Sequence, residues 1–265
     1  MAQDLGEALP LASQLNTLNR QRQYLTRQAV MKAQAQLAQQ EDSPIYIVEG
    51  KDFLPGIVGL IAGQITNATY RPTLAIHLDE ETSRGSARSI PEFHITHALD
   101  QISHLLVRYG DHAAAAGFTV ENSKLPAFKE ALREVSRDIL GGETPEPSLD
   151  IDAELHLAHV DWAFYDILQH LAPFGEENPQ PVFLTRNVSV SEAIAVGSEG
   201  KHLKLTLEHE GRRWPAIAFR LGHLTSVLPR HVDVVYHLDV NDWNGTRSLQ
   251  LVVLDLRPAH TNRAV

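Results

Sequence analysis

A stretch of glycine, proline and acidic residues, GGETPEPSLD at 141–150, separates two segments with different hydrophobic patterns. Before it, short apolar runs alternate with segments of helical periodicity, whereas after position 181 apolar and polar residues alternate with a period of two. The composition of the stretch is typical of a linker. A chain of 265 residues is long enough for one large domain or two small ones. The two patterns therefore predict two separate cores, one α/β and one all-β.

The first segment opens with a predicted long amphipathic helix over 10–40, followed by alternating strands and helices. Its leucines at helical spacing form an apolar stripe that needs a partner, and they are Leu11, Leu15, Leu18 and Leu25. After this helix, strands are expected at 45–49 and 73–78, and a loop is expected at 79–93. Helices are expected at 56–68, 95–108 and 123–140. Such alternation favours an α/β domain.

The second segment predicts a helix at about 153–171 and then five short strands. The strands are expected at 181–196, 202–210, 212–221, 231–240 and 247–256. Asn244-Gly245 joins the last two, and this dipeptide strongly favours a hairpin turn. Five short antiparallel strands suit a small barrel such as the OB fold.

Composition limits the chemistry that the chain can carry. It has no cysteine, so disulfides, thiolate nucleophiles and Cys-type zinc sites are excluded, and carboxylates and 14 histidines remain as metal ligands. His156 and His159 lack a carboxylate in the zincin arrangement, and no metal site is expected there. With no apolar run long enough for a membrane span and a polar N-terminus, the chain is expected to be soluble, cytoplasmic and without a membrane partner.

The net charge of −10 argues at first against a nucleic-acid partner, because a polyanion is held mainly by Lys and Arg. The acidic residues are concentrated in 41–185, however, while 1–40 and 186–230 are each net basic. Exposed charges more than about 8 Å apart are largely screened at physiological salt. Local patches, not the net charge, therefore decide whether the chain binds nucleic acid.

Two glycine-containing motifs are candidates for phosphate binding. In RGSARSI (84–90), Gly85, Ser86, Arg88 and Ser89 could converge on one phosphate, and the alternative is an exposed Ser/Gly loop with an incidental arginine. In YGDHAAAAGFTV (109–120), four alanines between Gly110 and Gly117 would let the backbone approach a ligand closely, with His112 at the mouth of a tight turn. The alternative there is an alanine-rich helix start with a hydrogen-bonded histidine.

The barrel segment contains a candidate single-strand-binding surface. Alternation places Arg212, Trp214 and Arg220 on one face of a strand, where bases could stack while phosphates pair with arginine. In the preceding strand, Leu203, Leu205 and Leu207 are expected to point inward, and His202 and Lys204 outward. The alternatives are that Trp214 belongs to the core, that Pro215 introduces a bulge that exchanges the faces, and that the polar face is only solvated.

The motifs also occur in an order that resembles one family. They are LNTLNRQRQ (15–23), FLPGIVGLIAGQI (53–65), RP (71–72), GSARSI (85–90), GDHAAAAGF (110–118), APFGEENPQPVF (172–183) and VGSEGKHLKLTLE (196–208). This series is similar to RecJ exonucleases from their interdomain helix onward. The resemblance implies a connecting helix at 1–43, a DHHA1-type domain at 44–142, a linker and helix at 143–180, and an OB-type domain at 181–265.

The resemblance also implies roles for individual residues. Ser86, Arg88 and Ser89 would hold the DNA end or backbone, and His112 with the glycine-rich backbone would approach the scissile phosphate. Where the family has Gly-Gly-His, this chain has Gly110-Asp111-His112, and a carboxylate beside a phosphate would repel it.

The Asp-His-His run that binds manganese or magnesium in the family's DHH domain does not occur in the chain. The resemblance therefore implies a part of a single-strand-specific 5′-to-3′ exonuclease of DNA repair and recombination that binds single-stranded DNA, holds no metal of its own and does not cut without a DHH domain, which a separate chain could supply. Two alternatives stay open: a non-catalytic scaffold that docks replication or repair proteins, and a stand-alone phosphodiesterase for short oligonucleotides that uses His112 and Asp111.

Overall fold

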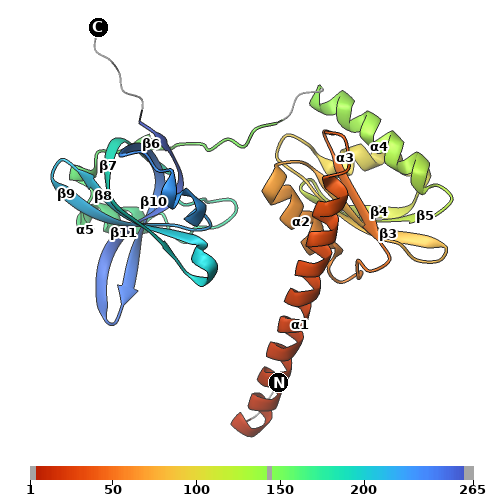
Figure 1. Ribbon diagram of the computed structural model, residues 1–265, viewed down its shortest axis with the longest axis horizontal. Coiled ribbons are helices and arrows are strands. Elements are labelled where there is room, and N and C mark those ends of the chain that lie inside the picture. Colours follow the sequence, from red (N-terminus) through yellow and green to blue (C-terminus); the bar gives the residue numbers. More distant parts are fainter. Residues whose placement is uncertain (1–3, 142–144, 260–265) are drawn as a thin grey trace. The chain divides into compact units, whose positions relative to one another are not determined.

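The computed structural model describes residues 4–141 and 145–259, and the chain divides into two compact units, 1–147 and 148–265 (Figure 1). Within the described residues, no helix is both long enough and apolar enough to cross a membrane. The fold class expected from the sequence is confirmed: a long N-terminal helix, a mixed α/β sheet and a five-stranded β-barrel.

The first unit begins with the helix α1 (Leu5–Leu37), which the leucine spacing predicted. Asp4 caps it, since its carboxylate accepts a hydrogen bond from the backbone N–H of Glu7 at 2.9 Å. Ala29, Val30 and Ala33 near its C-terminal end are buried among apolar residues of α2 (Val58–Thr69). The predicted apolar stripe is mostly exposed within this unit, because of its four leucines only Leu25 is partly buried.

A five-stranded sheet in the order β1-β2-β3-β5-β4 forms the centre of the first unit. Its strands are β1 (Tyr46–Gly50), β2 (Thr73–His77), β3 (Thr82–Arg88), β4 (Leu106–His112) and β5 (Ala115–Glu121). Only β1 and β2 are parallel, and the other pairs are antiparallel. α1 and α2 pack on one face of β1 and β2, while α3 (Ile95–Gln101) and α4 (Leu125–Leu140) pack on the other face of the sheet.

Two elements of the first unit differ from the prediction. The expected loop at 79–93 contains β3, a strand that the serines and arginines concealed because its outer face is polar. The helix expected at 95–108 ends at Gln101, and a 3₁₀ turn then leads into β4.

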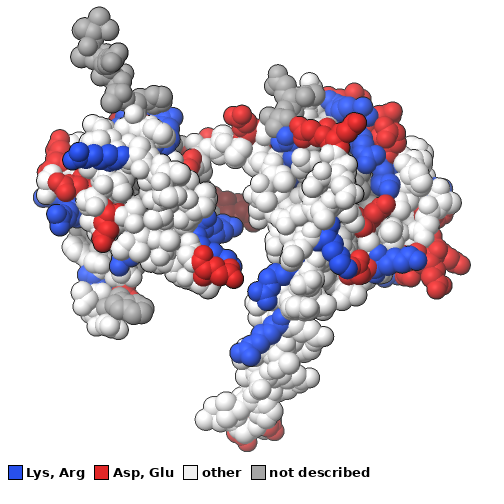
Figure 2. All heavy atoms as spheres, in the orientation of Figure 1, with Lys and Arg blue, Asp and Glu red and all other residues white. Residues whose placement is uncertain are grey.

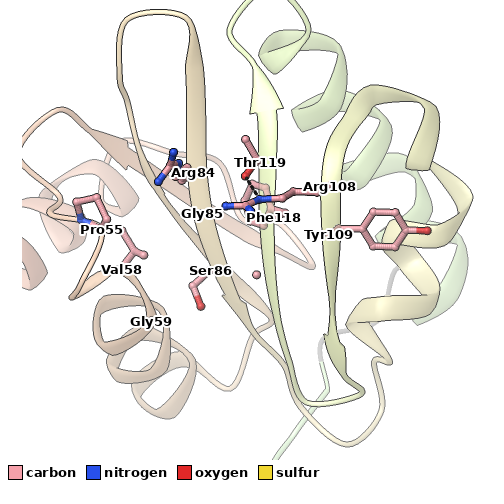
Figure 3. A pocket seen from close by; sticks show the side chains of 11 residues that line it. Pro55, Val58, Gly59, Arg84, Gly85, Ser86, Arg108, Tyr109, Phe118 and Thr119 are labelled. Atoms are coloured by element: carbon pink, nitrogen blue, oxygen red, sulfur yellow. Dashed lines mark hydrogen bonds between the residues drawn. The ribbon is translucent and has the colours of Figure 1, made fainter.

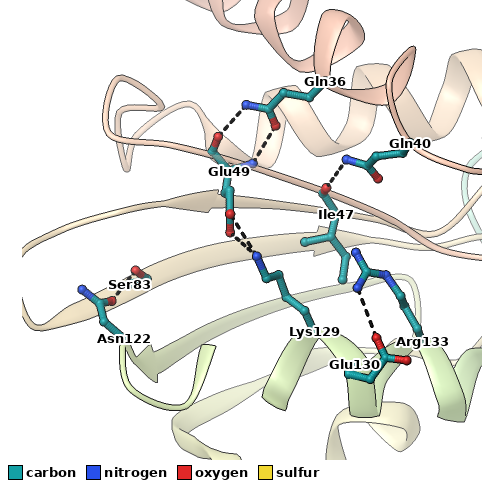
Figure 4. Close-up of polar contacts among 9 residues, drawn as sticks. All are labelled: Gln36, Gln40, Ile47, Glu49, Ser83, Asn122, Lys129, Glu130 and Arg133. Carbon is teal, nitrogen blue, oxygen red and sulfur yellow. Dashed lines mark hydrogen bonds and ion pairs between the residues drawn. The ribbon is translucent and has the colours of Figure 1, made fainter. Parts of the chain in front are cut away.

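Polar contacts fasten α1 and α4 to this sheet (Figure 4). The Lys129 ammonium of α4 lies 2.9 Å from a carboxylate oxygen of Glu49 in β1, and the pair is largely shielded from solvent. Ser83 in β3 donates a hydrogen bond of 2.6 Å to the side-chain oxygen of Asn122, at the end of β5. Side-chain contacts therefore connect α4 to β1, and β3 to the residue that follows β5, in addition to the backbone pairing of the strands.

The second unit is a closed barrel of five strands, with the two-residue β6 (Ala153–Glu154) added at β7. The barrel strands are β7 (Phe183–Val196), β8 (His202–His209), β9 (Arg212–Ala218), β10 (His231–Trp243) and β11 (Thr246–Pro258). Pairing of β10 with β7 closes the barrel. Leu205 and Tyr236 lie in its core, and burial raises the pKa of Tyr236 to about 12.

The linker side of the barrel also differs from the prediction. In place of one helix at 153–171, the chain forms β6, a 3₁₀ turn at Leu157–His159 and the short helix α5 (Trp162–Gln169). The predicted hairpin turn is confirmed, because Asn244 and Gly245 have φ angles of 51° and 77° between β10 and β11.

Candidate nucleic-acid interface

The functional candidate in the first unit is the face of β3, β5 and β4 beside the start of α2. Strand pairing sets three rows across these strands, because paired residues of an antiparallel sheet point to the same face. The rows are Arg84, Thr119 and Arg108; Ser86, Gly117 and Gly110; and Arg88, Ala115 and His112. The middle row carries two glycines, so the sheet backbone is uncovered there between rows that contain arginine.

A groove of about 430 Å³ lies over this face, and we call it the arginine groove (Figure 3). Its lining includes Gly59 from α2, Arg84 and Ser86 from β3, Gly117 and Thr119 from β5, and Arg108 from β4. The guanidinium of Arg108 extends over β5, where its Nε donates to the hydroxyl of Thr119 at 3.2 Å. No acidic residue is among the described residues that line the groove. The groove therefore favours an anion.

Arg88 is held beside the groove by short contacts. Its Nη1 donates to the Ser86 hydroxyl at 2.9 Å and to the backbone carbonyl of Ala87 at 2.8 Å. A Cβ on Gly59 of α2 would lie 3.0 Å from Nη2 of Arg88, so the glycine makes room for the guanidinium. Arg88 and Ser86 thus form a preorganised pair of donors for a phosphate.

Gly85 makes room for a core side chain on the opposite face of β3. A Cβ at this position would lie 2.2 Å from Cζ of Phe118, whose ring packs in the core beneath the sheet. Phe118 can cover the core under β3 only because residue 85 has no side chain.

The structure brings together most of the predicted phosphate residues of the first unit. Gly85, Ser86 and Arg88 share β3. On β4, Gly110 lies in the same row as Ser86, and His112 lies in the same row as Arg88. The turn at His112 is confirmed, because Ala113 and Ala114 link β4 to β5, and the alternative helix start is wrong.

Ser89 is turned away from this group. Its hydroxyl donates to the backbone carbonyl of Phe93, and its backbone N–H donates to the carbonyl of Ala114 at 2.9 Å. Its side chain thus fastens the end of β3 in place. The side chain of Asp111 lies outside the described part of the chain.

Sequence reasoning missed Arg84 and Arg108. Arg84 lay in a supposed loop, and Arg108 in a supposed helix. Only the strand order β3-β5-β4 reveals that they share a row, and no motif of the sequence marks that order.

In the barrel, the predicted faces of β8 are confirmed; on β9 the assignment of Trp214 to the outer face is wrong, and the alternative that Trp214 belongs to the core is confirmed. Leu203, Leu205 and Leu207 are buried, while Lys204 is exposed and His202 partly so. Trp214 is only 8% exposed, and it packs in the core with Ala216 and Ala218. The face of β9 that carries these three residues is therefore the inner one. Trp214 cannot stack on a base from this position.

The outer surface near the end of β9 carries a different aromatic side chain. Phe219 is 55% exposed, and its ring meets that of His202 edge-on with the centroids 5.3 Å apart. Arg220 follows, and its backbone N–H donates to Nδ1 of His202 at 3.0 Å. Arg212 lies at the start of β9, exposed, with its Nη1 donating to the carbonyl of Ala158 at 3.3 Å. His202, Phe219 and Arg220 therefore meet outside the barrel, whereas Arg212 lies at the other end of β9.

The described residues contain no group of three or more His, Cys, Asp or Glu side chains arranged to hold a metal ion. His156 is paired with Glu210, with 3.2 Å between Nε2 and Oε1, and its Nδ1 accepts a hydrogen bond from the backbone N–H of Ala158. The described residues thus do not fit a manganese or magnesium site, which needs several oxygen ligands around one ion.

Both units match known domain families. Residues 23–138 match the DHHA1 domain, and residues 151–255 match the RecJ OB domain. The chain is therefore a DHHA1 domain followed by an OB domain. It belongs to the RecJ family, and it corresponds to the C-terminal region of that family's proteins.

Relatives and solved structures agree with this assignment. Single-stranded-DNA-specific exonuclease RecJ of Thermus thermophilus is 32% identical over 260 residues, which cover 97% of this chain and 36% of the relative. RecJ of Bacillus subtilis is 28% identical over 96% of this chain and 33% of its own length. The crystal structure of Thermus thermophilus RecJ in complex with Mn²⁺ superposes with a TM-score of 0.76 at 30% identity, over 97% of this chain and 37% of that one. The chain thus spans about a third of the length of these relatives.

Proposed function

We propose that this chain binds single-stranded DNA and positions it for hydrolysis by a metal-bearing DHH domain, as part of a 5′-to-3′ exonuclease. The name of its relatives, single-stranded-DNA-specific exonuclease, supports the substrate and the reaction. The DHH domain would belong to the same protein or to a separate chain, and it would supply the ions that activate water and stabilise the leaving oxygen. The residues of this chain would bind and orient the strand.

The arginine groove is the observation that carries the proposal. Three arginines on the two outer rows surround a glycine floor, and no described acidic residue lines the groove. Arg84 and Arg88 are four residues apart on one strand, or about 13 Å, which is more than one phosphate requires. An extended sugar–phosphate backbone fits this arrangement better than a compact anion does.

The outer surface of the barrel would provide a second contact. His202, Lys204, Arg212 and Arg220 would face phosphates there, and the exposed ring of Phe219 would stack on a base. The described residues of both units would then bind the strand by its backbone and by stacking, both of which tolerate any base sequence.

Fluorescence anisotropy with a labelled oligothymidine tests the proposal. If four phosphates are contacted, affinity should fall roughly 50-fold between 50 and 200 mM salt, since each contact contributes about 0.7 to the slope. The double variant Arg84→Ala/Arg88→Ala should lower both the affinity and this slope. The matched control, Arg133→Ala/Arg137→Ala on α4, removes the same charge far from the groove face and should leave both unchanged.

Two results would contradict the proposal. One is an affinity for single strands that does not respond to salt, and the other is metal-dependent cleavage of the oligonucleotide by the purified chain. The second result would favour the stand-alone phosphodiesterase that uses His112 and Asp111.

A further inference from the structure

The helix α1 has an unusual charge for a chain of net charge −10. From position 8 to its end at Leu37 it contains no Asp or Glu, but it contains Arg20, Arg22, Arg27 and Lys32. Figure 2 shows Lys and Arg side chains along the middle of this helix, with acidic side chains only at its N-terminal end. The helix therefore presents a local positive potential that the net charge of the chain conceals.

Two of these arginines flank an exposed aromatic ring. Arg20, Tyr24 and Arg27 are spaced i, i+4 and i+7, so they form one stripe on the helix surface. All three are exposed, and Tyr24 is 56% exposed. The stripe points away from the side of α1 that packs on α2, where Ala29 and Ala33 are buried. Packing among the described residues of the first unit thus does not require a tyrosine at this position.

A cavity of about 290 Å³ lies beside the stripe, between α1 and α2. It is lined by Arg22, Gln23, Thr26 and Arg27 of α1 and by Gln64 of α2. The Thr26 hydroxyl donates to the backbone carbonyl of Arg22 at 2.8 Å, and Nη2 of Arg22 donates to the side-chain oxygen of Asn19 at 2.8 Å. Every described side chain in the lining is a cation, an amide or a hydroxyl, so the cavity offers mainly hydrogen-bond donors to an anionic ligand.

We propose that the Arg20–Tyr24–Arg27 stripe and the adjoining cavity form a further contact for single-stranded nucleic acid, outside the arginine groove. Tyr24 stacks on a base, Arg20 and Arg27 pair with the phosphates on either side, and the amides of Gln23 and Gln64 donate to the sugar–phosphate backbone. This inference rests on the proposed function, and it extends the path of the same strand along α1.

Charge and shape favour nucleic acid over an acidic protein surface as the occupant. A ring between two guanidinium groups matches the alternation of base and phosphate along a strand. An acidic protein surface would pair with the arginines but would leave the exposed ring of Tyr24 without an apolar partner.

The test is anisotropy with labelled dT20 on the full chain at 100 mM salt. Arg20→Ala/Arg27→Ala should weaken binding about tenfold and lower the salt slope by about 1.4, two contacts of about 0.7 each. Tyr24→Ala should weaken binding about tenfold, whereas Tyr24→Phe, which keeps the ring, should stay within about twofold of the wild type. Because all three residues are exposed, none of these variants should change the circular dichroism spectrum.

Two controls separate the possible failures. Gln14→Ala changes an exposed residue on another side of α1, and Arg133→Ala/Arg137→Ala removes the same charge from α4. If the wild type binds dT20 and Arg84→Ala/Arg88→Ala weakens it while the stripe variants do not, the stripe inference is overturned and the proposed function stands. Equal losses in the α1 and α4 double variants would also overturn it, since net charge would then be the cause. If the wild type binds no single strand, both proposals fail.

Discussion

The side chain of Gln36 in α1 pairs with the backbone of Glu49 in β1 through two hydrogen bonds. Its Nε2 donates to the Glu49 carbonyl at 2.7 Å, and its Oε1 accepts from the Glu49 N–H at 3.1 Å (Figure 4). One turn later, Nε2 of Gln40 donates to the carbonyl of Ile47 at 3.0 Å. Because β1 is an edge strand, these amides satisfy backbone groups that would otherwise be open to pairing with another chain.

Gln36→Ala should therefore destabilise the first unit. The loss should be about 1–3 kcal/mol, because two partly buried backbone groups of Glu49 lose their partners. Chemical denaturation followed by circular dichroism measures this loss. Gln34→Ala, at an exposed position of the same helix, is the matched control and should have an effect within about 0.5 kcal/mol. Equal stability of the two variants would show that the amide pair does not fasten α1 to the sheet.

Gly85 in β3 and Gly117 in β5 serve opposite faces of the sheet, and they should respond differently to alanine. Gly85→Ala should cost about 1–3 kcal/mol, since its Cβ would overlap the ring of Phe118, and Phe118→Leu should recover part of the loss. Gly117→Ala should fold normally, because nothing lies within 4 Å of its Cβ position, but it should weaken single-strand binding by raising the groove floor. Thermal melts and anisotropy separate the two effects. A stable Gly85→Ala variant would contradict the packing.

Trp214 in β9 should matter for stability, whereas Phe219, just after the end of β9, should matter for binding of single strands. Trp214→Ala should cost about 3–5 kcal/mol, as expected for a buried indole. Phe219→Ala should change stability by about 0.5 kcal/mol or less, since its ring is mostly exposed, yet it should weaken binding of single strands at least about fivefold. Phe219→Tyr, which keeps the ring, is the control. Should Phe219→Ala bind as well as the wild type, this part of the barrel would not contact the strand.

The stability of the barrel should fall at acid pH through His209. Burial lowers the pKa of His209, and the neighbouring His156, whose ring centroid is 4.5 Å away, lowers it further. The unfolded chain, with an ordinary pKa near about 6.5, then takes up this proton more readily than the folded chain does. The contribution of His209 to the free energy of unfolding is therefore complete above the pKa of the unfolded chain. It is lost as the pH falls through the lower pKa that His209 has in the folded chain.

Melting temperatures between pH 8 and pH 5 test this dependence. His209→Gln should lose less stability on acidification than the wild type does. His223→Gln removes an exposed histidine of the same unit and should keep the dependence of the wild type. If His209→Gln and the wild type have parallel pH profiles, His209 is not the titrating group.

The elements that could be predicted from the sequence are those in which periodicity and burial agree. Leu203, Leu205 and Leu207 alternate with polar residues on a strand with one buried face, and their orientation followed directly. Trp214 also alternates, but alternation alone does not say which face is inside. The arginines at 212 and 220 suggested the outer face, although Arg220 lies beyond the end of β9, with a left-handed φ of 66°.

The candidate site was only partly predictable, because it depends on pairing between distant strands. Ser86 and Arg88 occur in one motif and could be found together, whereas Arg108 joins them only through β5. Ser89 was assigned to phosphate because of its residue type, and its hydroxyl is instead used by the carbonyl of Phe93. Local sequence does not reveal which hydroxyl the fold itself requires.

The glycine floor between the arginine rows has a consequence for what the groove can distinguish. Gly110 and Gly117 present no side chain that could read the edge of a base. Under the proposed function, this glycine floor would therefore contact A, C, G and T alike. Under the proposed function, the exonuclease would have to move along strands of any base sequence, and a groove floor without side chains would meet that requirement.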